Sequence, residues 1–259
     1  MKKWKIATIK IESNVLNTAK AWEKFRNKKD VWSDITIYIP QKSLDNYSIE
    51  EYEIPFSAVK CFRHEQDVMY TTSNWKYIQI LPLYNQGSFN VFTNQIFYTH
   101  AVQRRMIQIH SSMIAYQGKG LLFLGPSGIG KTTMAELWNK YRNALIINGD
   151  MNFVQETEEC FLGWGTPWHG SSPYCENANV PVCALIVLKQ AQENSIRRLE
   201  GFEKVQLVSN NIIYPTWLEN GMELCLETLD HLLSSLPVYE LSCRPDEDAV
   251  RLTEKTIFN

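Results

Sequence analysis

A glycine-rich segment near the middle of the chain constrains the fold more than any other feature. Residues 125–132 read Gly-Pro-Ser-Gly-Ile-Gly-Lys-Thr, which matches the G-x-x-x-x-G-K-[S/T] pattern of a phosphate-binding loop, or P-loop. The apolar run 121–124 precedes this loop, and apolar residues recur at helical spacing over 134–141. A strand, a loop and a helix in this order are the context that such a loop requires. The sequence therefore predicts an α/β fold with a phosphate site.

The chemistry of phosphate binding accounts for the residue types in this loop. Glycines allow successive backbone N–H groups to turn toward phosphate oxygens, a conformation that side chains would obstruct. Lys131 brings a positive charge to the same oxygens, the hydroxyl of Thr132 can bind Mg²⁺, and the following helix directs its N-terminal dipole at the anion. The predicted nucleotide-binding residues are Gly125, Pro126, Ser127, Gly128, Ile129, Gly130, Lys131, Thr132 and Thr133.

Asp150 is the candidate for the acidic residue that phosphoryl transfer needs near the γ-phosphate. It follows the apolar run 144–147, which is typical of a core strand in a parallel sheet, and Gly149 lies directly before it. We expect Asp150 to contact Mg²⁺ or to accept a proton. An Asp after a strand can also be only a turn or capping residue, but its place about twenty residues after the P-loop favours the functional interpretation.

Residues 163–177 are rich in glycine, proline and aromatic side chains and predict a loop near the site. Glu176 in this loop is a further candidate metal ligand, and a solvated loop carboxylate explains it equally well. The next apolar run, 180–188, predicts a strand, and three basic residues follow it: Lys189, Arg197 and Arg198. They are candidates for neutralising charge on a transferring phosphoryl group, although most basic side chains are simply solvated.

The chain divides near residue 98 into an N-terminal α/β region, 1–97, and a P-loop region, 98–259. In the first region the patterns predict a helix over 17–25 and strands at 5–12, 35–39, 77–83 and 89–92. In the second they predict, besides the elements above, a helix from 101 that leads into a strand at 113–116, a tight turn at 117–120, a loop at 214–217 and helices over 224–233 and 246–257.

The composition disfavours several classes of protein. The 259 residues carry a formal net charge of −2, which argues against a strongly basic nucleic-acid-binding protein. No apolar run approaches the roughly 18 residues of a membrane span, and the first residues lack the apolar stretch of an export signal, so we expect no membrane contact and a cytoplasmic location. The six cysteines form no C-x-x-C pair and have no histidine at zinc-ligand spacing, which argues against a thiolate metal site.

Several segments of the second region resemble one kinase family when they are taken together. These segments are His110, 125–132, 148–150, 166–168, 176–177 and 243–250. The chain is similar over about residues 98–259 to the HPr kinase/phosphorylase-related, PEP carboxykinase-like P-loop kinases, especially the short relatives found in clusters for lasso-type and other ribosomally made peptides (RiPPs). The resemblance implies an HPr kinase-like α/β core that uses ATP and Mg²⁺ to phosphorylate a serine hydroxyl of a peptide or protein. Homo-oligomers occur in this family.

The resemblance also implies roles for particular residues. Such kinases carry two adjacent acidic residues after the strand that follows the P-loop; Asp150 matches the second, whereas Gly149 stands in place of the first, which serves as the base. Either Asp150 has taken over proton abstraction, or His110 or His169 assists, or the chemistry differs. His110 precedes the hairpin where the family also has a histidine, and a neutral core histidine is the alternative.

Two other functions remain open at this point. One is a kinase or carboxykinase that acts on a small metabolite, and the other is a nucleotide-dependent binding switch that phosphorylates nothing. Release of ADP that depends on an added hydroxyl-bearing peptide would favour the peptide kinase. The N-terminal region could recognise the acceptor through its aromatic residues, but core packing explains those residues just as well: Trp4, Trp22, Trp32 and Trp75.

Overall fold

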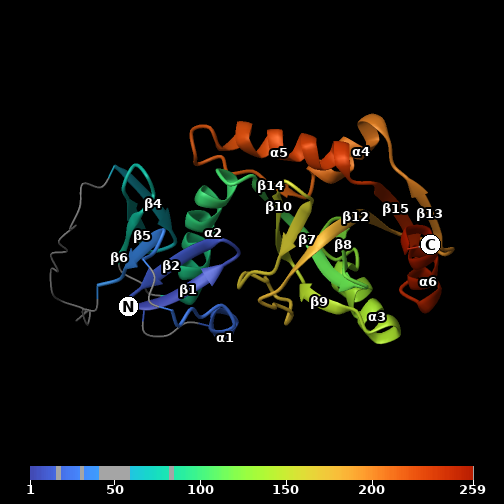
Figure 1. The fold of residues 1–259 in the computed structure, drawn as a ribbon, viewed down its shortest axis with the longest axis horizontal. Coiled ribbons are helices and arrows are strands. Elements are labelled where there is room, and N and C mark those ends of the chain that lie inside the picture. The colour runs from blue at the N-terminus through green and yellow to red at the C-terminus, as the bar shows by residue number, and fades with distance from the viewer. Residues whose placement is uncertain (16–18, 30–31, 41–58, 82–84, 259) are drawn as a thin grey trace. The chain divides into compact units, whose positions relative to one another are not determined.

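The protein is described by a computed structural model, which covers residues 1–15, 19–29, 32–40, 59–81 and 85–258. The chain separates into two compact units, Met1–His100 and Ala101–Asn259 (Figure 1). Both units combine strands with helices, so the predicted α/β class is confirmed. In the described part of the chain, no helix is both long and apolar enough to cross a membrane.

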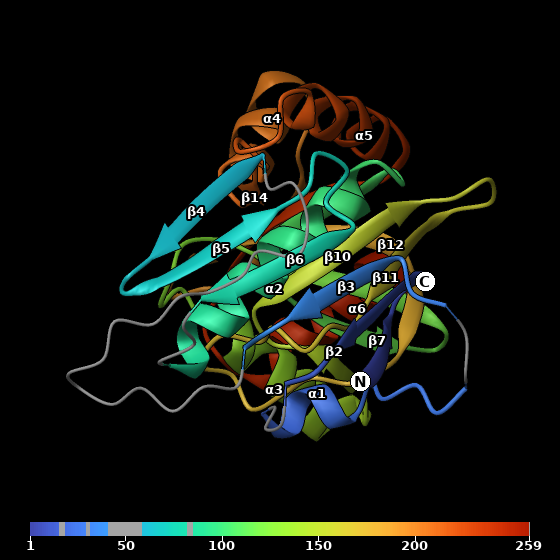
Figure 2. The same ribbon diagram turned by 90° about the vertical axis from the view of Figure 1, so that its left-hand side faces the viewer.

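The first unit contains a six-stranded mixed sheet with the order β1-β2-β3-β6-β5-β4. Figure 2 shows this sheet with α2 behind it. The strands β2, β3 and β6 are parallel neighbours, and the other neighbours are antiparallel. The elements are β1 (Lys2–Ile6), β2 (Ile9–Ser13), α1 (Lys20–Glu23), β3 (Ile35–Tyr38), β4 (Lys60–His64), β5 (Asp67–Thr71), β6 (Tyr77–Leu81) and α2 (Gln86–Val102).

Two expectations for this unit are wrong. The alternating segment 5–12 is a hairpin rather than one strand, because Ala7 adopts a positive φ of 51° and turns the chain between β1 and β2. Residues 89–92 belong to helix α2, not to a strand. Phe89 and Phe92 are buried members of a longer series that continues at Ile96 and Phe97, and this spacing of three to four residues marks one face of a helix.

The helix expected over 17–25 is present only as the short α1, with residues 17–18 outside the described part. The strand expected over 77–83 is β6 as far as Leu81, and 82–83 are likewise not described. Three of the four tryptophans are core residues, at 1–2% exposed: Trp4, Trp22 and Trp75. Trp32 is different, since its side chain is 75% exposed and Lys76 Nζ lies 5.5 Å from the centre of its ring.

The second unit is built on a nine-stranded sheet whose main path is β11-β10-β7-β8-β12-β15-β13, with β9 and β14 paired to β7. Its strands are β7 (Met106–Tyr116), β8 (Lys119–Leu124), β9 (Leu145–Asn148), β10 (Met151–Glu156), β11 (Phe161–Trp164), β12 (Asn179–Gln190), β13 (Ser195–Arg198), β14 (Ile212–Ile213) and β15 (Val238–Cys243). Its helices are α3 (Lys131–Arg142), α4 (Gly201–Ser209), α5 (Gly221–Ser235) and α6 (Glu247–Phe258).

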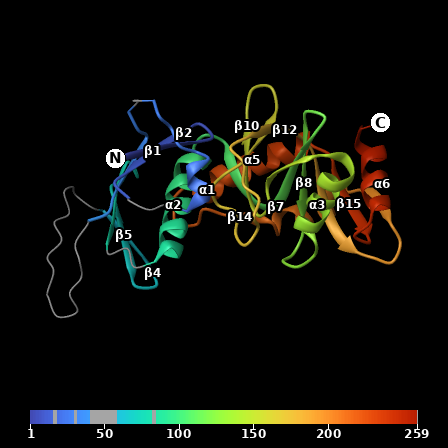
Figure 3. The ribbon, with the colours of Figure 1, turned by 90° about the horizontal axis from the view of Figure 1, so that it is seen from below.

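A parallel trio of strands, β8, β12 and β15, forms the centre of this sheet. One hydrophobic cluster joins the trio to two helices, with contributions from Phe123 of β8, Ile186 of β12, Leu241 of β15, Trp138 of α3 and Val250 of α6. Figures 1 and 3 show α5 and α3 on opposite sides of β7 and β8. The sheet is therefore covered by helices on both faces, which suits strands made of continuous apolar runs.

Most elements expected in this unit are confirmed, including β8, α3, β12, α5 and α6. The tight turn is also confirmed: Gln117 and Gly118 have φ values of 49° and 72° and join β7 to β8 as a two-residue hairpin. Two expectations are wrong. The helix expected from 101 ends at Val102, and 106–112 belong to β7. The sequence misled here because a strand that is buried on both faces has no hydrophobic period that distinguishes it from a helix. The apolar run 144–147 predicts a strand of a parallel sheet, whereas the strand found there, β9, pairs with β7 in the antiparallel direction.

Candidate active site

The P-loop connects β8 to α3 and has the backbone that its glycines predict. Gly128 and Gly130 adopt φ values of 80° and 112°, which side-chain-bearing residues rarely adopt. A Cβ added at either position would meet nothing within 4 Å, so the backbone conformation rather than lack of space requires glycine there. The loop leads directly into the N-terminus of α3, and the first backbone N–H groups of a helix are the groups that commonly bind an anion.

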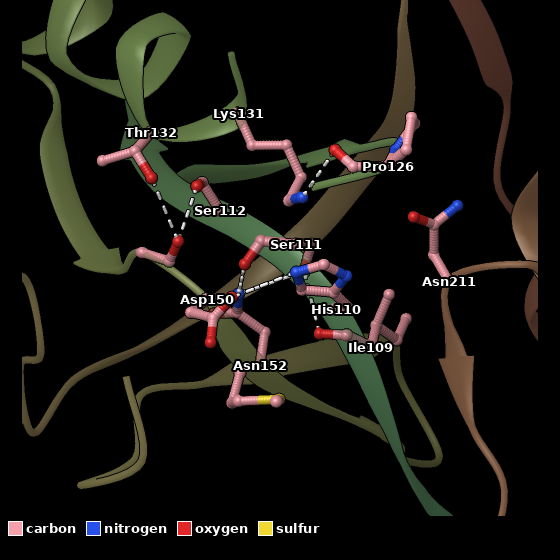
Figure 4. Close-up of polar contacts among 12 residues, drawn as sticks. Ile109, His110, Ser111, Ser112, Pro126, Lys131, Thr132, Asp150, Asn152 and Asn211 are labelled. Atoms are coloured by element: carbon pink, nitrogen blue, oxygen red, sulfur yellow. Dashed lines mark hydrogen bonds and ion pairs between the residues drawn. The ribbon is translucent and has the colours of Figure 1, made fainter. Parts of the chain in front are cut away.

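Lys131 and Thr132 begin α3 and are both held by backbone carbonyls (Figure 4). Lys131 Nζ donates to the carbonyls of Gly125 at 2.9 Å and Pro126 at 3.3 Å, and its side chain is nearly buried. Burial lowers the pKa of Lys131 below its ordinary value, and the charge of Asp150 opposes part of that effect. The hydroxyl of Thr132 donates to the carbonyl of Gly149 at 3.3 Å.

Asp150, which lies directly before β10, forms a pair with His110 of β7. His110 Nε2 lies 3.1 Å from Asp150 Oδ1, and the two side chains are 28% and 23% exposed. The neighbouring backbone is paired as well, because Ser111 N donates to Asp150 O at 2.9 Å. With a proton on Nε2, the imidazole donates to the carboxylate and fixes its orientation. The pair can therefore hold or move a proton beside the P-loop.

Asn148 anchors the turn that carries Asp150. Its Oδ1 accepts the N–H groups of Asp150 at 2.9 Å and Met151 at 3.1 Å. Its Nδ2 donates to the carbonyls of Thr166 at 3.0 Å and Trp168 at 2.9 Å. One fully buried amide thus ties Asp150 to the loop 165–178, which has no regular strand or helix over most of its length.

The loop 165–178 explains why residue 149 is glycine. A Cβ at Gly149 would lie 1.8 Å from Ser172 Oγ and 2.5 Å from Ser172 Cβ, so no side chain fits there. The same loop touches Asp150 itself, because a Cβ at Gly170 would lie 2.0 Å from Asp150 Oδ2. Ser172 therefore fills the space that a side chain at residue 149 would need, and Asp150 lies beside the P-loop without a neighbouring carboxylate at residue 149.

Two clefts, each of about 390 Å³, lie on either side of the P-loop. The first, here called the phosphate cleft, is the more polar one. It is lined by His110, Ser127, Gly128, Gly130, Lys131, Thr132, Thr133, Gly149, Asp150, Ser171, Ser172 and Pro173. The second, here called the flanking cleft, has more apolar surface, and its lining includes Ile129, Met134, Leu188, Lys189, Cys243 and Arg244. Burial raises the pKa of the Cys243 thiol to about 11, so this thiol stays protonated and apolar near neutral pH.

The structure brings together His110, Lys131, Thr132, Thr133 and Asp150 in the phosphate cleft, and places Lys189 in the flanking cleft. Glu176 and His169 are not among the residues that line either cleft. The backbone N–H of Glu176 donates to Ile147 O at 2.7 Å, and the ring Nδ1 of His169 contacts the carbonyl of Ser172.

The two arginines lie on β13, at the edge of the sheet, and also do not line either cleft. Arg197 contacts Glu203 at 2.6 and 2.9 Å and Glu240 at 3.0 Å, and Arg198 contacts Glu200 at 2.7 Å. The carboxylates raise the pKa of Arg197, so it stays charged. The roles predicted for both arginines stay predictions.

The donor set in the phosphate cleft fits Mg²⁺. Among the described residues, no group of three or more His, Cys, Asp or Glu side chains could hold a metal by itself. Mg²⁺ does not need such a group, since it binds through one or two protein oxygens together with waters and substrate phosphates. Thr132 and Asp150 supply an alcohol and a carboxylate in the same cleft.

Sequence reasoning missed three residues of this site: Asn148, Ser172 and Asn211. Asn148 could have been suspected, because an Asn before Gly at a strand end often bonds the backbone that follows it. Ser172 and Asn211 belong to no motif. Their importance comes from contacts with residues 23 and 86 positions earlier, at Gly149 and Gly125, which no local pattern shows.

Three comparisons with known proteins place this chain. No curated protein matches the sequence. The solved structure titled "Structure of the Hpr(Ser) kinase/phosphatase from Coxiella burnetii" is similar over 57% of this chain and 95% of its own, with 11% identity and a TM-score of 0.36, a level that carries no argument about activity. The model of the family "ScmC: SynChlorMet cassette protein ScmC" matches residues 88–242, more than half of the chain. This chain therefore belongs to the SynChlorMet cassette protein ScmC family.

Proposed function

We propose that this protein is an ATP- and Mg²⁺-dependent kinase that transfers the γ-phosphoryl group to a serine hydroxyl of a peptide or protein. One observation carries the proposal: the P-loop and the His110–Asp150 pair line the same phosphate cleft. A phosphate-binding loop alone is compatible with a nucleotide switch. A carboxylate beside that loop, held by a histidine, adds what a hydroxyl acceptor requires, a group that accepts its proton.

In the proposed mechanism the acceptor hydroxyl lies between Asp150 and the γ-phosphate. Asp150 takes the proton from the hydroxyl as the oxygen attacks the γ-phosphorus and the bond from that phosphorus to the β,γ-bridging oxygen breaks, so that ADP leaves. His110 keeps the carboxylate oriented. Lys131 leaves the carbonyls of Gly125 and Pro126 and contacts phosphate oxygens. Mg²⁺, held by Thr132 and directly or through water by Asp150, would neutralise phosphate charge. Most of the rate comes from positioning these groups.

We place the nucleoside in the flanking cleft. That cleft borders the P-loop at Gly128, Ile129 and Gly130, so a nucleotide with phosphates on the loop can extend into it. Its apolar side chains suit the faces of a purine. Lys189 and Arg244 at its rim can contact the sugar or stack on the base.

The acceptor we propose is a peptide made within the same gene cassette, as a RiPP precursor of lasso type would be. The name of the family, which describes a cassette protein, and the resemblance to peptide kinases support this choice. The N-terminal unit is the proposed recognition element, and Trp32 is its exposed aromatic candidate. Homo-oligomer formation and a cytoplasmic location belong to the same proposal.

Intact-mass measurement tests this function. Peptides encoded beside the gene are incubated with ATP, Mg²⁺ and either the wild-type protein or Lys131→Ala. A gain of about 80 Da, one phosphoryl group, with the wild type alone supports the proposal, and fragment spectra then identify the hydroxyl. Accumulation of ADP without any peptide gaining mass contradicts it and favours a metabolite kinase or an ATP-driven switch.

A further inference from the structure

Asn211 connects the P-loop to the strand that carries His110. It lies between α4 and β14 and is 5% exposed. Its side-chain Oδ1 accepts the N–H of Gly125 at 2.9 Å, while its backbone carbonyl accepts the N–H of His110 at 2.8 Å. Figure 4 shows Asn211 on the opposite side of His110 from Asp150. One residue thus contacts both halves of the proposed active site.

Asn211 is itself fixed at two points. Its Nδ2 donates to Leu207 O at 2.9 Å, and its backbone N–H donates to Val208 O at 2.9 Å, so the last turn of α4 holds it. Directly after it, β14 pairs with β7, with Ile212 opposite Ile109. The contact with His110 is therefore continuous with a strand pairing, and the contact with Gly125 is made by a side chain with little freedom to turn.

The contact with Gly125 matters most when a nucleotide binds. In the structure both polar groups of Gly125 are paired, the N–H with Asn211 and the carbonyl with Lys131. When Lys131 turns toward phosphate, the carbonyl loses that partner and Asn211 still holds the residue. A buried N–H without an acceptor is unfavourable, so Gly125 would otherwise move toward another acceptor and shift the start of the loop.

We propose that Asn211 is a positioning residue that sets the distance between the P-loop and the His110–Asp150 pair. It touches neither nucleotide nor acceptor in this assignment. It acts through Gly125 on one side and His110 on the other. The expected kinetic effects rest on the proposed function, whereas the expected effect on the loop itself does not.

Three variants isolate the contact. Asn211→Leu keeps approximate size and removes the acceptor for Gly125 and the donor to Leu207. Asn211→Asp keeps an oxygen acceptor for Gly125, loses the donor to Leu207 O and places a second carboxyl oxygen there instead. Asn139→Leu is the matched control, because it removes a comparable side-chain bond, Asn139 Nδ2 to Ala144 O at 2.9 Å, at the far end of α3 from the P-loop. Asn211→Ala replaces Asn211→Leu if the latter does not fold.

The first readout is hydrogen exchange without nucleotide, measured on the peptic fragment that spans 121–131. Asn211→Leu should speed exchange of this fragment by about tenfold, in the range expected when one buried hydrogen bond is lost. Asn211→Asp and Asn139→Leu should leave it near the wild-type rate. Wild-type exchange in Asn211→Leu overturns the proposal. Equal acceleration in Asn211→Asp also overturns it, because keeping the acceptor for Gly125 would then make no difference to the loop.

The second readout separates KM from kcat. Asn211→Leu should raise KM for ATP and lower kcat, each by about tenfold, since the loop is displaced both from the nucleotide and from the base. Asn211→Asp should restore both to within about threefold of wild type. A fall in kcat alone, with unchanged KM, contradicts a role through Gly125. If the wild-type protein neither binds nor turns over ATP, the proposed function fails, and the exchange experiment still decides the role of Asn211.

Discussion

The two sides of the phosphate cleft are built in different ways. The P-loop side is one continuous segment, 125–133, in which Gly125, Gly128 and Gly130 adopt positive φ values that favour glycine. The acidic side is assembled from three places in the sequence: His110 on β7, the turn 148–150 and the loop 165–178. A motif search finds the first side at once. The second side exists only after the sheet has formed, because its parts are held by β7–β10 pairing and by the buried amide of Asn148.

This difference has a functional consequence. Substitutions on the P-loop side should mainly change the affinity for nucleotide. Substitutions on the acidic side should mainly change the rate of phosphoryl transfer from bound nucleotide. The two effects are separable because the sides share a cleft and no segment of chain. Three measurements test how complete this separation is.

The largest effect is expected from Asp150→Asn. This change removes the proposed proton acceptor and keeps the shape of the side chain, so kcat should fall by about 10²–10⁴-fold, the usual contribution of a general base. ATP affinity should stay within a few-fold of wild type. Lys131→Ala, on the P-loop side of the cleft, is the comparison, and it should weaken ATP binding as well as slow phosphoryl transfer. Transfer rates and ATP titrations check this, and an Asp150→Asn variant with unchanged turnover would show that Asp150 is not the base.

A smaller effect is expected from Gly149→Ala. The new Cβ meets Ser172 Oγ at 1.8 Å, so the loop 165–178 must move away from Asp150. We expect about tenfold slower transfer with little change in ATP binding, comparable to misplacing a group near the chemistry. Adding Ser172→Gly to this variant removes both atoms that clash and should recover most of the loss. Single-turnover rates of both single variants and the double variant measure this; no recovery in the double variant would mean that Gly149 is needed for its backbone instead.

The smallest effect is expected in the pH dependence of ATP affinity, which tests an electrostatic interaction between Lys131 on the P-loop side and Asp150 on the acidic side. Burial lowers the pKa of Lys131, and phosphate binding needs the charged amine. ATP affinity, titrated from neutral pH up to the ordinary lysine pKa near 10.4, should therefore begin to fall at a lower pH than an ordinary lysine would allow. The charge of Asp150 raises the pKa of Lys131, so Asp150→Asn should move the fall to lower pH. Lys131→Arg, which stays charged, is the control.

Calorimetric titrations across this pH range measure the effect in all three proteins. Identical pH profiles for wild type and Asp150→Asn would show that the two sides do not interact electrostatically.

The sequence predicts correctly those features that depend on neighbouring residues in the chain. The P-loop, the hairpin at Gln117 and Gly118, and the amphipathic α3 and α6 each follow from residues within one short window. The misreadings arose where tertiary contacts decide. Phe89 and Phe92 are compatible with a short strand until the later members of the same helix face are counted. The direction of β9 depends on its pairing with β7, about 30 residues earlier, which its own apolar run does not show.

The same limit applies to the site. Asp150 could be predicted from its place after a strand, but its histidine partner could not be derived from spacing, since His110 lies forty residues earlier on another strand. Charge alone makes Arg197 and Arg198 candidates in the sequence. In the structure Arg197 pairs with Glu203 of α4 and Glu240 of β15, and Arg198 pairs with Glu200.

The ammonium of Lys131 is bonded to its own loop, because it donates hydrogen bonds to the carbonyls of Gly125 and Pro126. An incoming nucleotide must compete with two internal acceptors, so part of its binding energy is spent on releasing the lysine. Under the proposed function, release of ADP would be helped by the same contacts, because the lysine can return to these two carbonyls. The internal contacts of Lys131 would then favour release of nucleotide over long retention of it.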